Sequence, residues 1–106
     1  YAVADYDLAM AFNLLGEVLQ RAGGAQQALP LLQEAGRRFE AIAKQRPERA
    51  AERMASVCLT EQGECLFNLG RYDEAAAAYQ ESIRQAEQQK EQLGMDGQSP
   101  TLHRSA

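Results

Sequence analysis

The chain has 106 residues, of which 45% are hydrophobic and 25% charged, and its formal net charge is −4. This length fits one small domain, and the apolar share excludes a wholly disordered chain. The negative charge argues against a nucleic-acid partner. The apolar stretches are far shorter than the roughly 20 residues that a membrane-spanning helix needs, so we also expect no membrane partner.

The composition favours helices, and glycine and proline residues indicate where these helices begin and end. Ala, Gln, Leu and Glu occupy 54 positions, whereas Val, Ile and Thr occupy seven. Gly23 and Gly70 are placed to end helices, and Pro47 suits a first helical turn. The predicted elements in chain order are helices over residues 3–22, 25–45, 48–69 and 72–93, followed by an irregular tail over 94–106.

A sequence repeat with a spacing of 47 residues organises the chain. It aligns Gly16 with Gly63, and Gly23 with Gly70. The same offset also pairs Glu17 with Glu64, Leu19 with Leu66, Ala28 with Ala75, Gln33 with Gln80, and Glu34 with Glu81. Each unit holds two helices joined by a short connection, which predicts antiparallel hairpins.

The first predicted helix has two apolar stripes. One stripe follows the helical period and is expected to face the core; it consists of Leu8, Ala11, Phe12, Leu15, Val18 and Leu19. The other lies roughly opposite and consists of Val3, Tyr6, Met10 and Leu14. Because a helix that is apolar on two faces is normally covered on both, we expect the second stripe to be covered by further repeats, by another copy of the chain or by a bound segment.

The stretch from Asn68 to Ala75 resembles the centre of a tetratricopeptide repeat. That family has a small residue in the first helix, a glycine at the turn, and then Tyr, Ala and an aromatic residue in the second helix. The matching residues here are Gly63, Gly70, Tyr72, Ala75 and Tyr79. The first repeat matches less closely, with Ala25 and Leu32 at the two aromatic positions. A spacing of 47 residues instead of about 34 is similar to long-helix members with repeats of more than about 40 residues.

The resemblance implies an all-α solenoid of four helices over residues 1–93, with repeats at about 4–46 and 47–93. It also implies a non-catalytic scaffold or adaptor that binds a peptide or helix segment of a partner, within a larger multidomain protein such as a bacterial regulator. The alternative is a self-association module that acts as a structural dimer. Two repeats are fewer than the three that such arrays usually need, so we expect a longer array or a homodimer.

The concave groove of the family maps onto the first and third predicted helices. The residues predicted to line it are Met10, Asn13, Leu14, Glu17, Gln20, Arg21, Val57, Thr60, Glu61, Glu64, Phe67 and Asn68. The residues that hold a C-terminal carboxylate in some members are missing, and the glutamates make this groove acidic. We therefore expect a partner segment that is partly apolar and neutral to basic.

The sequence contains no constellation that would support catalysis or bind a metal. Cys58 and Cys65 lie roughly 10.5 Å apart along one predicted helix, which is too far for a disulfide. No further ligand stands at metal-binding spacing, and His103 in the tail has no partner group nearby. We expect buried, reduced thiols in a cytoplasmic protein, with no cofactor, no metal and no enzymatic activity.

Overall fold

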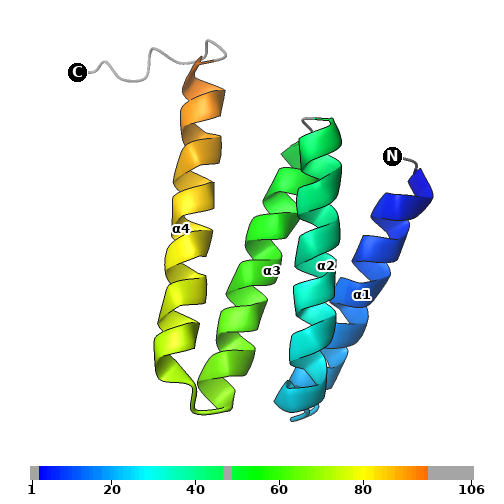
Figure 1. Cartoon of the computed structure of the whole chain (residues 1–106), viewed down its shortest axis with the longest axis vertical. Helices are drawn as coiled ribbons and strands as arrows, with labels where there is room; N and C mark the ends of the chain where they lie inside the picture. Colours follow the sequence, from blue (N-terminus) through cyan, green and yellow to red (C-terminus); the bar gives the residue numbers. More distant parts are fainter. Residues whose placement is uncertain (1–2, 47–48, 96–106) are drawn as a thin grey trace.

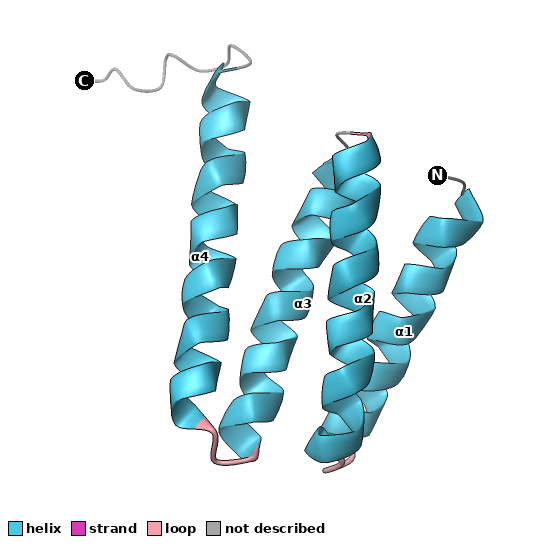
Figure 2. Cartoon of the chain, in the orientation of Figure 1, coloured by secondary structure: helices cyan, strands magenta, loops and turns pink. Residues whose placement is uncertain are grey.

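The computed structural model describes residues 3–46 and 49–95, and nearly all of these residues are helical (Figure 1). The four helices are α1 (Val3–Arg21), α2 (Ala25–Gln45), α3 (Arg49–Asn68) and α4 (Tyr72–Met95). Each begins and ends within two residues of its predicted position. No strand occurs in the described ranges (Figure 2), so the predicted all-α class is confirmed. Most of the predicted tail, residues 96–106, lies outside them.

The helices pack in chain order as a stack of antiparallel hairpins. The contacts are between α1 and α2, between α2 and α3, and between α3 and α4, with a smaller contact between α1 and α3. In Figure 1, α1 and α4 therefore form the two edges of the stack. This arrangement is that of a helical-repeat solenoid, in which each unit contacts only its neighbours.

The two hairpin turns end α1 and α3 in the same way. Gly23 and Gly70 have φ angles of +92° and +79°, in the left-handed region that other residues rarely adopt. After each glycine the next backbone N–H donates to a carbonyl five residues earlier, from Gly24 to Leu19 and from Arg71 to Leu66, both at 2.8 Å. This is the Schellman ending of a helix, and it recurs at the 47-residue offset.

The core forms two clusters along α2 and α3. One surrounds Phe39, which is fully buried among small residues of α1, α2 and α3. The other surrounds Leu32, which is also fully buried and packs in the cluster that contains Cys65 and Ala75. Because α2 and α3 each contribute to both clusters, the stack depends on the packing between these two helices.

The structure reverses part of the predicted faces of α1: several residues of the predicted core stripe are exposed, whereas Phe12 and Leu19 of that stripe pack against the two core clusters. Leu8, Leu15 and Val18, which were expected in the core, are 44%, 52% and 63% exposed. From the opposite stripe, Tyr6 and Met10 pack against the Phe39 cluster instead of lying on an open face. The remaining members of that stripe are Leu14, which is exposed, and Val3, whose side chain is outside the described part of the structure.

The physical reason for this reversal is close helix approach. The side of α1 that meets α2 carries the buried small residues Ala9 and Gly16. A Cβ added to Gly16 would lie 2.8 Å from the Leu32 side chain, and one added to Gly63 would lie 2.7 Å from the Tyr79 ring. Small residues therefore select the packed side in both hairpins, whereas counting large apolar residues points to the wrong side of α1.

Replacing Gly63 by alanine tests this close approach. We expect Gly63→Ala to lower the free energy of unfolding by about 1 kcal/mol, because the clash with the Tyr79 ring outweighs the gain in helix propensity. The matched control is Gly36→Ala, whose Cβ would meet only the end of the flexible Gln62 side chain at 3.1 Å and the Cys58 Cβ at 3.5 Å. Urea denaturation should show the control to be at least as stable as the native chain. Equal stability of the two variants would contradict the argument.

Candidate functional site

The predicted groove residues lie on α1 and α3, which contact each other across one side of the stack. We call this surface the α1–α3 face. Its exposed apolar side chains are Leu14, Val57 and Phe67, which are 52%, 36% and 57% exposed. The exposed polar members are Arg21, Thr60, Glu64 and Asn68, and the half-buried members are Met10, Glu17, Gln20 and Glu61. An apolar surface bordered by carboxylates is thus available to a partner.

Asn13 is placed differently from the other predicted groove residues. It is only 4% exposed, and its Oδ1 accepts a hydrogen bond from Cys58 Sγ at 3.2 Å. Asn13 therefore joins α1 to α3 beneath the α1–α3 face and does not contribute to the surface itself. A buried polar pair of this kind also fixes the register of the two helices.

The carboxylate of Glu61 is the most perturbed group on the α1–α3 face. Its Oε1 atom is buried, and no residue in the described ranges donates a hydrogen bond to it. Burial, and after it the negative charges of Glu17 and Glu64, raise the Glu61 pKa to about 7, while Arg21 opposes them. Arg21 is itself paired with Glu17 at 2.8 Å. The site therefore holds an acceptor that a donor from a partner would satisfy.

An exposed aromatic pair closes the end of the α1–α3 face near the second hairpin turn. The rings of Phe67 and Tyr72 meet edge to face, with centroids 5.3 Å apart, and Tyr72 is 61% exposed. Tyr72 was recognised in the sequence only as a repeat position. The sequence could have indicated this pair, because Tyr72 follows the predicted groove residue Phe67 just across the turn at Gly70.

The cysteines are free and buried, as predicted. Burial, together with nearby glutamates, raises the thiol pKa of Cys58 to about 12 and that of Cys65 to about 11. Both thiols are therefore protonated and unreactive at neutral pH. In the part of the chain that the structure describes, no group of three His, Cys, Asp or Glu side chains could hold a metal ion. His103 lies outside that part.

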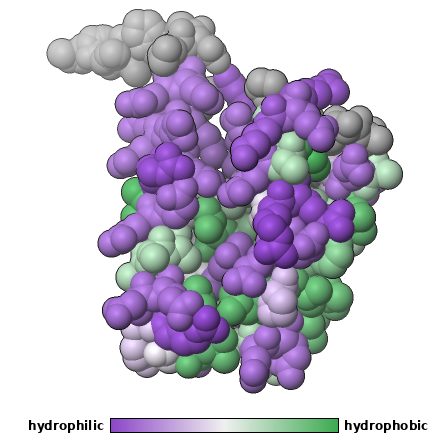
Figure 3. Space-filling view, in the orientation of Figure 1, coloured by the Kyte–Doolittle hydropathy of each residue, from purple (hydrophilic) through white to green (hydrophobic). Residues whose placement is uncertain are grey.

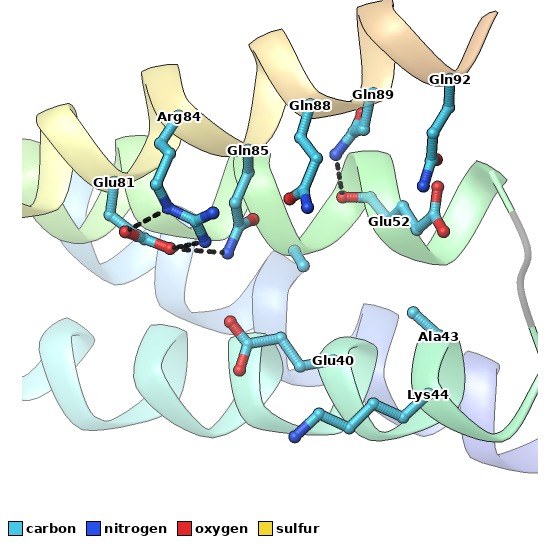
Figure 4. A pocket seen from close by; sticks show the side chains of 11 residues that line it. Glu40, Ala43, Lys44, Glu52, Glu81, Arg84, Gln85, Gln88, Gln89 and Gln92 are labelled. Carbon is cyan, nitrogen blue, oxygen red and sulfur yellow. Dashed lines mark hydrogen bonds and ion pairs between the residues drawn. The ribbon is translucent and has the colours of Figure 1, made fainter. Parts of the chain in front are cut away.

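A second surface, which the sequence analysis missed, lies between α2 and α4. It is a pocket of about 530 Å³ lined by Glu40, Ala43, Lys44, Glu52, Ala55, Glu81, Arg84, Gln85, Gln88, Gln89 and Gln92. Figure 4 shows the glutamines of α4 pointing into the space between the helices, with Gln89 and Gln92 beside Glu52 of α3, and Gln89 Nε2 donates to the Glu52 carbonyl at 2.9 Å. The spacing of these glutamines along one face of α4 was the signal that could have revealed it.

The α2–α4 side of the molecule is hydrophilic. In Figure 3 most side chains along α4 are polar or charged, and Arg84 is held by Glu81 in a fork of two hydrogen bonds. Such a surface resembles solvated helix more than a recognition site, because no large apolar side chain anchors it. Separately, none of the described helices is both long and apolar enough to span a membrane.

Comparison with known families identifies one segment of the chain. Residues 57–89 match the tetratricopeptide repeat family. The matched segment contains most of α3 and the first part of α4, and it includes the hairpin in which Gly63 meets Tyr79. Comparison with curated proteins and with solved structures gives no match.

Proposed function

Because the chain carries a tetratricopeptide repeat in α3 and α4, we propose that it is a non-catalytic module that binds a peptide or helix segment of a partner protein on its α1–α3 face. The observation that carries this proposal is the combination of exposed Phe67 with the buried, unpartnered Oε1 of Glu61. The exposed Phe67 ring supplies an apolar anchor and the glutamates of this face supply acceptors, so the surface favours a ligand that has both an apolar side chain and a donor.

The charge of the α1–α3 face favours a neutral to basic partner. Glu17 and Glu64 lie close enough to Glu61 to raise its pKa, whereas the cation Arg21 is engaged by Glu17. A lysine or arginine of the partner would relieve this repulsion and donate to Glu61, whereas an acidic partner would increase it. Interactions of this kind weaken as salt screens the exposed charges.

Reversing one charge on the α1–α3 face tests the proposal. Peptides selected from a random library against the native chain should be enriched in basic and apolar residues. We expect Glu64→Lys to weaken their binding about tenfold at low salt, measured by fluorescence anisotropy, because an attractive charge becomes repulsive. At high salt the difference should shrink.

The control for this experiment is Glu87→Lys, which makes the same change at an exposed position of α4. It should leave the affinity of the selected peptides nearly unchanged. Enrichment of acidic peptides, or an equal loss of affinity in both variants, would contradict binding at the α1–α3 face.

A further inference from the structure

α1 presents an apolar face to solvent at the edge of the stack. Leu8, Leu15 and Val18 are 44%, 52% and 63% exposed, and three exposed alanines lie between and beyond them. We call this set the outer face of α1; its residues are Ala4, Leu8, Ala11, Leu15, Val18 and Ala22. It extends over about 27 Å of helix, which is more apolar surface than scattered exposed residues would give.

In the second repeat the positions equivalent to the outer face of α1 are covered by a neighbouring helix. At the 47-residue offset the outer face of α1 corresponds to Ala51, Ala55, Cys58, Gln62 and Cys65 of α3 and to Leu69, which directly follows this helix. In α3 these positions pack against α2: Cys58 lies in the cluster of Phe39, and Gln62 Nε2 donates to the Leu32 carbonyl at 3.3 Å. In α3 this surface of the repeat therefore packs against a neighbouring helix, whereas in α1 the equivalent surface is exposed.

The pattern of the outer face indicates which helix would cover it. Its residues follow one another at spacings of four, three, four, three and four, which is the seam of a coiled coil. Their positions are symmetric about the level of Asn13. In an antiparallel pair of two such helices, Leu8 would lie opposite Val18 and Ala11 opposite Leu15 of the other copy. The central layers then pair a large residue with a small one, and this allows close approach.

Charge and dipole favour the antiparallel direction. Asp7 and Arg21 flank the seam on the same side of α1, near opposite ends, and both are exposed. An antiparallel pair brings Asp7 of each copy toward Arg21 of the other and also opposes the two helix dipoles. A parallel pair would instead stack Ala11 on Ala11 and Leu15 on Leu15, so loose and crowded layers would alternate.

The opposite edge of the stack does not offer a comparable surface. On the outer side of α4, the exposed Ile83 is surrounded by Gln80, Glu87 and Lys90, which are also exposed. Head-to-tail packing of α4 on the outer face of α1 would place these polar groups against leucine and valine. A closed pair of identical faces avoids this arrangement.

We propose that two copies of this chain associate through the outer faces of their α1 helices, packed antiparallel about a twofold axis at the level of Asn13. Of the residues that line the α1–α3 face, only Arg21 also takes part in this interface. It also differs from the stripe of Val3, Tyr6, Met10 and Leu14 that the sequence predicted for self-association.

Sedimentation equilibrium of the native chain should give twice the mass of one chain. Leu15→Glu should weaken the dimer about a hundredfold, because each interface would bury two carboxylates among apolar residues. Since Leu15 is exposed within the chain, the circular dichroism of the variant should stay native. Ile83→Glu is the matched control, because it places the same charge at an exposed apolar position of α4 and should leave the dimer intact.

Cysteine cross-linking tests the direction of packing. A mixture of Ala11→Cys chains with Leu15→Cys chains should form disulfide-linked pairs on oxidation, whereas either variant alone should form few. The native thiols will not interfere, because both are buried. A native chain that stays monomeric, a dimer that survives Leu15→Glu, or self-linking of one variant as efficient as in the mixture would overturn the proposal.

Discussion

Replacing Phe39 by alanine should leave most of the chain unfolded in water. The Phe39 ring is fully buried, and the Tyr6 ring packs against its edge with centroids 5.3 Å apart. The other buried residues of this cluster are Ile42, four alanines and Cys58, and the larger side chains that pack against it are only partly buried. We expect a loss of about 3 to 5 kcal/mol, which is comparable to the whole stability of a small domain.

The measurement is urea denaturation followed by far-ultraviolet circular dichroism. Phe39→Leu keeps most of the volume and should lose no more than about 1.5 kcal/mol, so a folded variant remains for comparison. Ile83→Ala, at a position that is 57% exposed, serves as the control and should change the stability by less than about 1 kcal/mol. A Phe39→Ala variant as stable as this control would show that the core does not depend on Phe39.

Replacing Glu61 by glutamine should stabilise the chain at pH 8 and not at pH 4. The folded pKa of Glu61 is about 7, against 4.5 for a free side chain, so between these values the folded state binds more protons than the unfolded state. The free energy of unfolding therefore falls as the pH rises through this window. This pKa difference corresponds to a loss of roughly 3 kcal/mol in the free energy of unfolding above pH 7. Because Glu61 is partly accessible to water, we expect Glu61→Gln to recover about 2 kcal/mol.

Urea denaturation of both chains at several pH values between 4 and 8 measures this effect. The gain in Glu61→Gln should grow with pH and level off above about pH 7. Glu87→Gln removes an exposed carboxylate of α4 and should give no such dependence. A gain that is independent of pH would show that the charge of Glu61 is not its cause.

The sequence was sufficient to predict the helices and the repeat. The glycines at the two turns, the 47-residue offset and the alanine-rich composition each depend on local chemistry, which a single sequence displays directly. Gly63 and Tyr79 were recognised as repeat positions, whereas their close approach became visible only in the structure.

The faces of α1 could not be assigned in this way. The apolar spacing groups three exposed residues, Leu8, Leu15 and Val18, with Phe12 and Leu19, which pack against the core. Spacing alone therefore does not separate surface from core on this helix. Only the comparison with α3, whose equivalent positions contact α2, explains this. The burial of Asn13 was missed for a similar reason, because its hydrogen bond to Cys58 joins residues 45 positions apart.

The neighbour-only packing of the four helices also determines how the chain reaches this structure. Since nearly every helix contact joins elements that follow one another in the sequence, folding closes only short loops. Topologies with such local contacts fold in microseconds to milliseconds, far faster than sheet proteins of similar length. Either hairpin can start the process, and the partner hairpin then adds to the exposed side of α2 or α3.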